Sequence, residues 1–327
     1  MDILRTPDSR FDGIPDYPFA AHYHEVAAGL RMHFVDEGPR QTGTTVVMLH
    51  GEPSWSYLYR NMISKVSAAG IRVVAPDLIG FGKSDKPAAR GDYSIERHLQ
   101  WLTSLLIDHL QLQDITLVGQ DWGSTLGLRL AVAHPGRFDR IIIGNGMLLT
   151  GDEPRRWLIS GWRWFTRFSP WFPVGLIVAG ASGRRLRAQE RAAYDAPFPD
   201  ARYQAGARAF PALIPVTPDN PQSDAQRRAW QQLAQWQKPF ITCFSDADPT
   251  TACYRDDMVR RIPGARQQTH HTLRGRHFLQ EDSPGEFADI IIGACAARSA
   301  LGDRHGAAHS DQSAPRAVIK HRQPTSS

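Results

Sequence analysis

The residues best suited to nucleophilic chemistry lie in one stretch, residues 115–127, which reads ITLVGQDWGSTLG. An apolar, β-branched run ends at Gly119, and small residues then open an amphipathic helix through Leu130. This pattern predicts a buried strand that turns sharply into a helix, with Asp121 at the turn. The spacing Gly-x-Asp-x-Gly is that of a nucleophile elbow, a strained turn in which glycines let strand and helix approach closely. We therefore take Asp121 as the candidate nucleophile.

A carboxylate at this position limits the reactions that the nucleophile can carry out. Aspartate has a reference pKa of about 3.9, so it is anionic at neutral pH without help from a base. It can displace a leaving group from an sp3 carbon, giving an alkyl ester that water must then cleave. The structural alternative is an aspartate that caps the first turn of the helix. The companion residues favour the catalytic interpretation.

A general base and an acid are predicted in loops that follow later strands. His277 is the candidate base, which would remove a proton from the hydrolytic water. Its acid partner is Asp248 or Asp246, which follow the same strand. We favour Asp248, because Pro249 would end the strand and stiffen the loop, and we expect Asp246 to cap the loop backbone. Structural roles are expected for His50, His98, His109, His134, His270 and His271.

Two further residues are expected beside the nucleophile. The indole N–H of Trp122 is a donor without acceptor capacity, which suits a leaving anion, although an aromatic residue here could simply pack beneath neighbouring helices. The backbone N–H groups of Glu52 and Trp122 would form an oxyanion hole for ester hydrolysis. The Glu52 side chain could orient the water or cap a helix.

Alternating strands and helices must position these residues. Strands are predicted at residues 24–26, 30–35, 45–49, 72–76, 115–119, 140–143, 240–244 and 267–273, and helices at 56–66, 94–110, 122–130, 224–236 and 284–297. This alternation predicts an α/β fold with a mostly parallel sheet covered on both faces. Functional groups collect at the carboxyl ends of such strands.

The alternation breaks between residues 148 and 224, where tryptophans crowd helical segments and prolines interrupt the rest. We interpret this segment as a helical cap inserted into the α/β core. The predicted division is therefore core at 1–147, cap at 148–224 and core again at 225–298. Residues 299–327 contain few large apolar side chains, which predicts a disordered tail.

Composition sets the broad class. The chain has 327 residues, of which 42% are hydrophobic, enough for one large α/β domain with a subdomain. Its three cysteines fit no metal site and no disulfide framework, which indicates a reducing compartment. Without a signal-peptide pattern or a membrane-spanning run, we expect a cytoplasmic monomer with no membrane partner. The net charge is +5, but the arginines of residues 155–191 alternate with apolar residues at helical spacing, which indicates a solvated face rather than a nucleic-acid site.

Taken together, these residues resemble the haloalkane dehalogenases of the α/β-hydrolase superfamily, in particular the branch with a His-Gly-Glu-Pro motif. The resemblance spans roughly residues 15–295 and rests on HGEPSWSYLYR at 50–60, PDLIGFGKSDKP at 76–87, GQDWG at 119–123, DAPFPD at 195–200 and HFLQED at 277–282. It implies the α/β-hydrolase fold and hydrolysis of haloalkanes to an alcohol, a halide ion and a proton. It implies no metal and no organic cofactor.

The resemblance also implies roles for individual residues. Asp121 would be the nucleophile, Asp248 the acid, His277 the base and Trp122 one halide ligand. A cap tryptophan would be the second halide ligand, and Trp162 fits by its position before Ser169-Pro170, with Trp164 as the alternative.

The chain departs from the family pattern in two places. Arg276 stands before the predicted base where the family usually has a small residue, and the tail beyond Ser299 has no counterpart.

Two other functions compete with this interpretation. An epoxide hydrolase shares the fold and the aspartate nucleophile, and it needs cap tyrosines, for which Tyr194 and Tyr203 are candidates. A non-catalytic ligand-binding protein would lack the nucleophile, the acid or the base, whereas all three positions are filled here.

Overall fold

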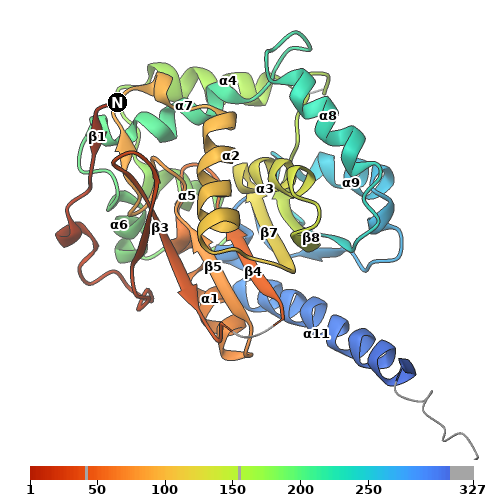
Figure 1. Cartoon of the computed structure of the whole chain (residues 1–327). Helices are drawn as coiled ribbons and strands as arrows, with labels where there is room; N and C mark the ends of the chain where they lie inside the picture. The colour runs from red at the N-terminus through yellow and green to blue at the C-terminus, as the bar shows by residue number, and fades with distance from the viewer. Residues whose placement is uncertain (41–42, 154–155, 310–327) are drawn as a thin grey trace, which may run out of the picture.

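A central eight-stranded sheet organises the computed structural model, which describes residues 1–40, 43–153 and 156–309 (Figure 1). The strands follow the order β10-β9-β8-β7-β4-β5-β3-β2 across the sheet. Their bounds are β2 (His22–Ala27), β3 (Leu30–Glu37), β4 (Thr45–Leu49), β5 (Arg72–Pro76), β7 (Ile115–Asp121), β8 (Phe138–Gly146), β9 (Phe240–Ser245) and β10 (His271–Leu273). A separate pair joins β1 (Ile3–Leu4) to β6 (Lys86–Pro87).

The sheet is mostly parallel, as the sequence predicts. The neighbouring strands from β5 across β4, β7, β8 and β9 to β10 all run parallel, and the antiparallel pairs are β2 with β3 and β3 with β5. In the middle, Val118 of β7 is paired with Met48 of β4 and Ile142 of β8. The carboxyl ends of β4, β7, β9 and β10, which carry the predicted site residues, therefore lie at one edge of the sheet.

Helices connect most of these strands. Their bounds are α1 (Arg60–Ala68), α2 (Ile95–Thr103), α3 (Trp122–Ala133), α4 (Arg156–Phe168), α5 (Val174–Ala181), α6 (Ala188–Asp195), α7 (Ala205–Leu213), α8 (Ser223–Leu233), α9 (Arg255–Arg261), α10 (Leu279–Asp282) and α11 (Pro284–His309). A π-helical turn (Ser104–His109) continues α2 to the end predicted from its apolar period. Ser94 begins α2 as its cap, since its side chain accepts a hydrogen bond from the Arg97 N–H.

Side chains alternate along each strand, and this divides the core in two. On β4, Val46 and Met48 belong to a cluster with apolar side chains of α1 and α11. Val47 and Leu49 belong to the opposite cluster, with side chains of α2, α3, α8 and α9. Helices therefore cover both faces of the sheet, as Figure 1 shows. Burial of these faces supplies the main driving force for the fold.

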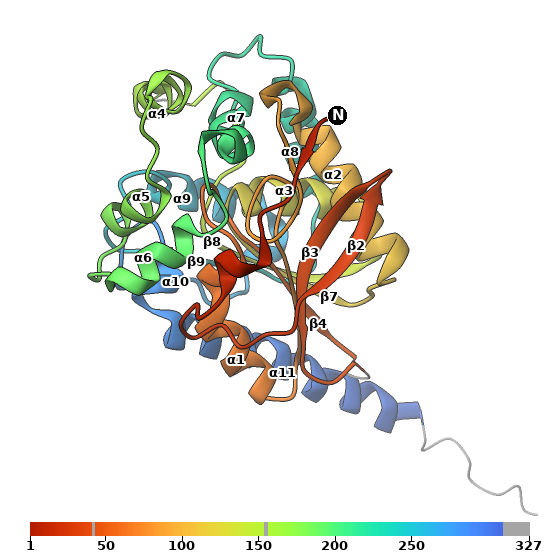
Figure 2. The ribbon, with the colours of Figure 1, turned by 90° about the vertical axis from the view of Figure 1, so that its left-hand side faces the viewer.

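Helices α4 to α7 occupy the segment in which the alternation of strands and helices breaks. They lie beyond the edge of the sheet (Figure 2), with α4 against α7 and α5 against α6. The N-terminal residues are tied to this part of the chain. The Thr6 hydroxyl donates to the Pro197 carbonyl at 2.7 Å, and Arg10 Nε donates to the Ala196 carbonyl at 3.3 Å.

Two predictions about the C-terminal part need correction. The last strand begins at His271 rather than at residue 267, because residues 263–265 form a 3-10 turn and the chain only then joins β9. The final helix does not end near Ala297 but continues to His309, past the start predicted for the tail. Alanine favours helix, and the four glycines of α11 do not break it. The predicted disorder of residues 310–327 lies outside the described residues.

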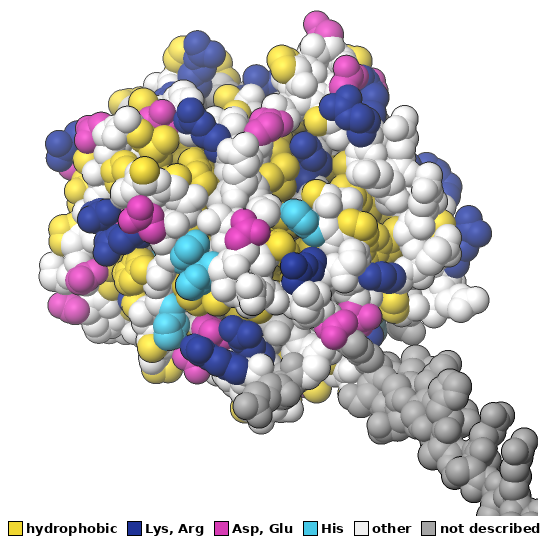
Figure 3. Space-filling model, viewed as in Figure 1, with side chains coloured by type: hydrophobic (Ala, Val, Ile, Leu, Met, Phe, Trp, Pro, Cys, Tyr) yellow, Lys and Arg dark blue, Asp and Glu magenta, His cyan; other side chains and the backbone are white. Residues whose placement is uncertain are grey.

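The surface carries charges of both signs. On the face shown in Figure 3, Lys and Arg side chains are interspersed with Asp and Glu side chains and with apolar atoms. Across the part of the chain that the structure describes, no helix is both long enough and apolar enough to cross a membrane.

Candidate active site

Asp121 lies at the junction of β7 and α3, where the sequence predicts the elbow. Its backbone has φ 51° and ψ −121°, a conformation that non-glycine residues rarely adopt. Neighbouring glycines make the turn possible, since a Cβ on Gly123 would lie 1.9 Å from the Leu49 carbonyl oxygen. The strain, of order 1–3 kcal/mol in such positions, is held by the surrounding packing. The elbow presents the Asp121 carboxylate at the edge of the sheet.

The Asp121 carboxylate has two polar neighbours. The backbone N–H of Glu52 donates to Oδ1 at 3.0 Å, which places one predicted oxyanion donor against it. His277 Nε2 lies 3.6 Å from Oδ2. The nucleophile and the base predicted from the sequence are thus brought together, although they lie far apart along the chain.

The acid predicted for His277 is also in place. His277 Nδ1 lies 3.2 Å from Asp248 Oδ2. The backbone N–H groups of Thr250 and Thr251 donate to the same carboxylate at 2.9 and 3.2 Å, and the Thr251 hydroxyl donates to it as well. Asp246 instead accepts a hydrogen bond from the Gly275 N–H at 2.9 Å, the loop-backbone contact expected of it. The geometry therefore supports Asp248 over Asp246.

Electrostatics favour a charged pair of Asp248 and His277. Burial alone would raise the pKa of Asp248, but hydrogen bonds from His277 and Thr251 lower it to about 2. Burial would likewise lower the pKa of His277, but its contacts with Asp121 and Asp248 raise it to about 10. Esterification of Asp121 would remove one of these two negative charges. The pKa of His277 would then fall, so that more of the ring is neutral and able to accept a proton at the stage when a base is needed.

Two side chains that the sequence reasoning missed hold the His277 loop. Asn145, at the end of β8, donates through Nδ2 to the carbonyls of Arg276 and His277 at 2.8 and 3.0 Å, and its Oδ1 accepts from the Ser245 N–H at 2.8 Å. Gln120 Nε2 donates to the His277 carbonyl at 3.2 Å and lies 3.2 Å from His277 Nε2. The sequence feature that could have identified Asn145 is its position as a polar residue between Gly144 and Gly146 at the end of a predicted strand.

A cavity of about 230 Å³ opens above Asp121 and is mainly apolar. It is lined by Glu52, Pro53, Asp121, Trp122, Met147, Ile159, Trp162, Ile177, Ala181, Ile214, Thr250, His277 and Phe278. Trp122 and Trp162 therefore face the same space as the candidate nucleophile. Trp164 does not line this cavity and has 66% of its surface exposed, on the outer side of α4.

Glu52 is buried beside this cavity and contacts the predicted halide ligand Trp162. Trp162 Nε1 donates to Glu52 Oε2 at 3.2 Å. Burial, and then the neighbouring Asp121 carboxylate, raise the pKa of Glu52 well above its usual range. The neutral, protonated acid is therefore favoured, which keeps a second negative charge away from Asp121.

The elbow, the acid–histidine pair and the order of the strands together define an enzyme of the α/β-hydrolase class. The family model described as the alpha/beta hydrolase fold matches residues 44–174. A haloalkane dehalogenase of Mycolicibacterium paratuberculosis is 49% identical over 296 residues, which cover 89% of this chain and 98% of that protein. One of Psychrobacter cryohalolentis is 50% identical over 297 residues, covering 89% and 97%.

A solved structure extends this similarity to three dimensions. The tetrameric haloalkane dehalogenase DpaA from Paraglaciecola agarilytica NO2 has a TM-score of 0.83 to this chain at 36% identity, covering 88% of this chain and 97% of its own. The chain belongs to the haloalkane dehalogenase family, as its motifs predict.

Proposed function

We propose that this protein is a haloalkane dehalogenase that hydrolyses carbon–halogen bonds through an ester on Asp121. A carboxylate oxygen of Asp121 attacks the halogen-bearing sp3 carbon, and the halide leaves with the bonding electron pair. The indole N–H groups of Trp122 and Trp162 stabilise the developing anion, since both residues line the cavity above Asp121. In this role Trp162 Nε1 turns from Glu52 Oε2 toward the halide.

Hydrolysis of the ester completes the cycle. His277 takes a proton from a water molecule, whose oxygen attacks the carbonyl carbon of the esterified Asp121. The backbone N–H of Glu52, 3.0 Å from Oδ1 in this structure, and that of Trp122 stabilise the oxyanion. The bond between the carbonyl carbon and the alkoxy oxygen then breaks. The alkoxide takes the proton of the newly formed Asp121 carboxyl group and leaves as the alcohol, and the proton held by His277 passes to solvent. Asp248 orients His277 and stabilises the imidazolium.

One observation carries this proposal. A mainly apolar cavity contains an aspartate at a strained elbow, 3.6 Å from a histidine that is itself paired with a second aspartate. This combination fits attack on an apolar electrophile, followed by base-assisted hydrolysis. The family membership supports the same reaction.

The His277→Phe variant tests the mechanism. Incubated with 1-bromobutane, it should release one equivalent of bromide and retain a butyl ester on the peptide that contains Asp121, because displacement proceeds while hydrolysis lacks its base. Intact-protein and peptide mass spectrometry would detect the adduct. An Asp121→Asn variant is the matched control and should release no bromide. A wild-type enzyme that releases no halide from bromoalkanes would refute the proposal.

The structure gives little support to an epoxide hydrolase. Neither Tyr194 nor Tyr203 lines the described cavity, and the Tyr194 hydroxyl is buried and donates to Glu281. The opening epoxide oxygen would thus lack the tyrosine donors that the reaction requires. An adduct formed from epoxides and not from bromoalkanes would reverse this preference.

We further propose the domain division into a core at 1–147, a cap at 148–224 and a core at 225–298. Its support is the position of α4 to α7, which connect β8 to α8 and contribute Ile159, Trp162 and Ile177 to the cavity. A cytoplasmic monomer remains the expectation from the sequence, and light scattering of the purified protein would measure the oligomeric state.

A further inference from the structure

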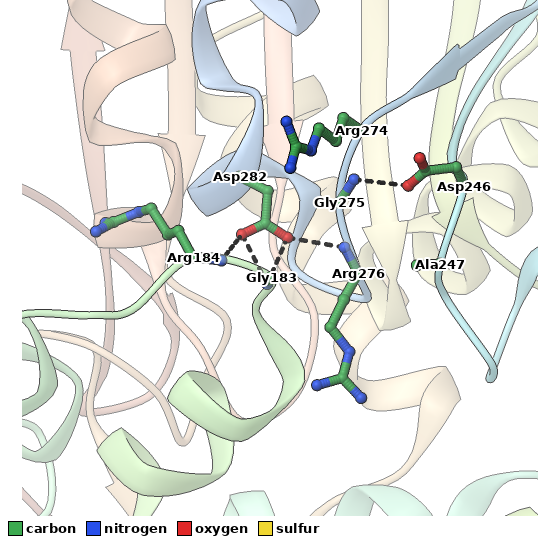
Figure 4. Close-up of a pocket in the computed structure, with 8 residues that line it drawn as sticks. All are labelled: Gly183, Arg184, Asp246, Ala247, Arg274, Gly275, Arg276 and Asp282. Carbon is green, nitrogen blue, oxygen red and sulfur yellow. Dashed lines mark hydrogen bonds between the residues drawn. The ribbon is translucent and has the colours of Figure 1, made fainter.

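A second cleft, of about 460 Å³, lies beside the loop that carries His277 and outside the catalytic cavity (Figure 4). At this cleft Asp282, the last residue of α10, accepts hydrogen bonds from three backbone N–H groups. These belong to Gly183, Arg184 and Arg276, each at 2.8 Å. Asp282 therefore joins the His277 loop to the segment that follows α5.

Arg276 makes a second connection between the same two parts of the chain. Its Nη1 donates to the Gly180 carbonyl at 3.0 Å, in the last turn of α5. The Phe278 N–H donates to the next carbonyl, that of Ala181, at 3.4 Å. A guanidinium at the carboxyl end of a helix is favourable, because the last carbonyls have no partner within the helix and carry partial negative charge.

Helix α5 is also a wall of the catalytic cavity. Ile177 and Ala181 line that cavity together with His277 and Phe278. The carboxyl end of α5 thus contacts the His277 loop on one side and the predicted substrate space on the other. A small displacement of α5 would change the room available for an alkyl chain.

We propose that Arg276 is a specificity-determining residue, whose bond to Gly180 holds the end of α5 against the His277 loop and so limits the alkyl length that the cavity accepts. Asp282 fixes the backbone of both segments, and the Arg276 guanidinium sets how closely α5 approaches. This inference rests on the proposed dehalogenase function. Arg276 acts by positioning α5, since it does not line the catalytic cavity.

The same loop offers a matched control. Arg274 is exposed like Arg276, and its side chain makes no hydrogen bond or ion pair with the residues that the structure describes (Figure 4). Arg274→Ala and Arg276→Ala thus remove the same charge from the same loop, but only Arg276→Ala removes a bond to α5. Arg276→Lys keeps a cationic donor near Gly180 and serves as the rescue variant.

Two measurements test the proposal on the full-length enzyme. Hydrogen exchange of the amides at residues 175–181 should be at least about fivefold faster in Arg276→Ala than in the wild type, while Arg274→Ala matches the wild type. The ratio of kcat/KM for 1-bromohexane to that for 1-bromopropane should rise at least about fivefold in Arg276→Ala. In Arg276→Lys this ratio should lie between the values of the wild type and Arg276→Ala. Arg274→Ala should leave the ratio unchanged.

The outcomes separate the possible errors. Unchanged exchange and an unchanged ratio in Arg276→Ala would overturn the proposal, and equal changes in Arg274→Ala would assign the effect to loop charge instead. If Arg276→Ala does not fold, the ratio in Arg276→Lys decides, since a weaker bond must still shift it. A wild type that releases no halide refutes the proposed function, whereas the exchange of α5 tests the role of Arg276 in holding α5 without reference to catalysis.

Discussion

At Glu52, a single substitution can remove the ability of the side chain to ionise while nearly keeping its shape. Its Oε2 accepts a hydrogen bond from Trp162, and its Oε1 has no partner among the described residues. Burial and the nearby Asp121 raise its pKa well above the usual range, so the neutral acid is favoured in the folded protein. The Glu52→Gln variant has nearly the same shape and is neutral at every pH.

The pKa shift predicts a difference in stability. Folding raises the pKa of such a carboxyl group above its value in the unfolded chain, which is about 4.3 for glutamate. The contribution of the group to the stability of the fold is complete below the unfolded pKa and is lost as the pH rises through the folded pKa. Each unit of difference corresponds to about 1.4 kcal/mol. Glu52→Gln should therefore match the wild type near pH 4 and have a progressively higher free energy of unfolding than the wild type as the pH rises to 8. Thermal denaturation should show a higher Tm for Glu52→Gln at pH 8, by about 2–4 °C for each kcal/mol gained.

Activity should follow the same logic. Bromide release by Glu52→Gln should stay within about threefold of the wild type near neutral pH, since a hydrogen-bonding amide replaces a hydrogen-bonding acid. Above the raised pKa, the wild type should lose activity because an ionised Glu52 repels Asp121 and the departing halide, and Glu52→Gln should not. A fall of more than about 100-fold in Glu52→Gln, or no gain in its relative stability between pH 4 and pH 8, would refute the reasoning and assign Glu52 an ionised role.

The other predictions concern the halide ligands, the acid and the loop support. Trp162→Phe removes the indole N–H from the cavity and should raise the halide dissociation constant about 5- to 30-fold by fluorescence titration, the equivalent of about 1–2 kcal/mol, whereas Trp164→Phe should leave it unchanged. Asp248→Asn removes the acceptor and the charge that orient His277. It should slow ester hydrolysis about 10³–10⁴-fold while rapid mixing still shows an initial burst of one halide equivalent, and loss of the burst would contradict the assignment. Asn145→Asp keeps the acceptor for the Ser245 N–H but loses the donors to the His277 loop. It should lower the free energy of unfolding by about 1–3 kcal/mol in urea denaturation together with kcat, and wild-type stability would show that Asn145 does not support the loop.

The sequence predicts most of the sheet because buried parallel strands appear as continuous apolar runs. Residues 45–49 and 72–76 match β4 and β5 in the structure. The predicted start of the last strand was wrong. A strand as short as β10 pairs only where β9 lies beside it, and no local sequence pattern encodes that contact. The predicted end of the final helix was also wrong. The low content of large apolar residues after Ala297 indicates a tail, but alanine favours helix and α11 continues to His309.

The candidate site was predicted where residue type and spacing carry chemistry, as for Asp121 and His277. Trp162 and Trp164 could not be separated, because a helix turns about 200° over two residues and the sequence does not say which face meets the cavity. Asn145 was missed because its role depends on two loops that approach it only in the folded protein. The sequence flagged Arg276 as unusual, but its carbonyl partner in α5 is visible only in three dimensions.

The hydrogen bonds from Thr6 and Arg10 to the carbonyls of Pro197 and Ala196 give the first residues of the chain a use that their irregular sequence does not suggest. They fasten the segment between α6 and α7 from outside. A label or an immobilising linker at the N-terminus would therefore pull on the connection between α6 and α7, which pack against α5 and α4, the helices that line the cavity. Helix α11 packs with α1 against one face of the sheet, so an attachment there is not made through the residues that hold that connection.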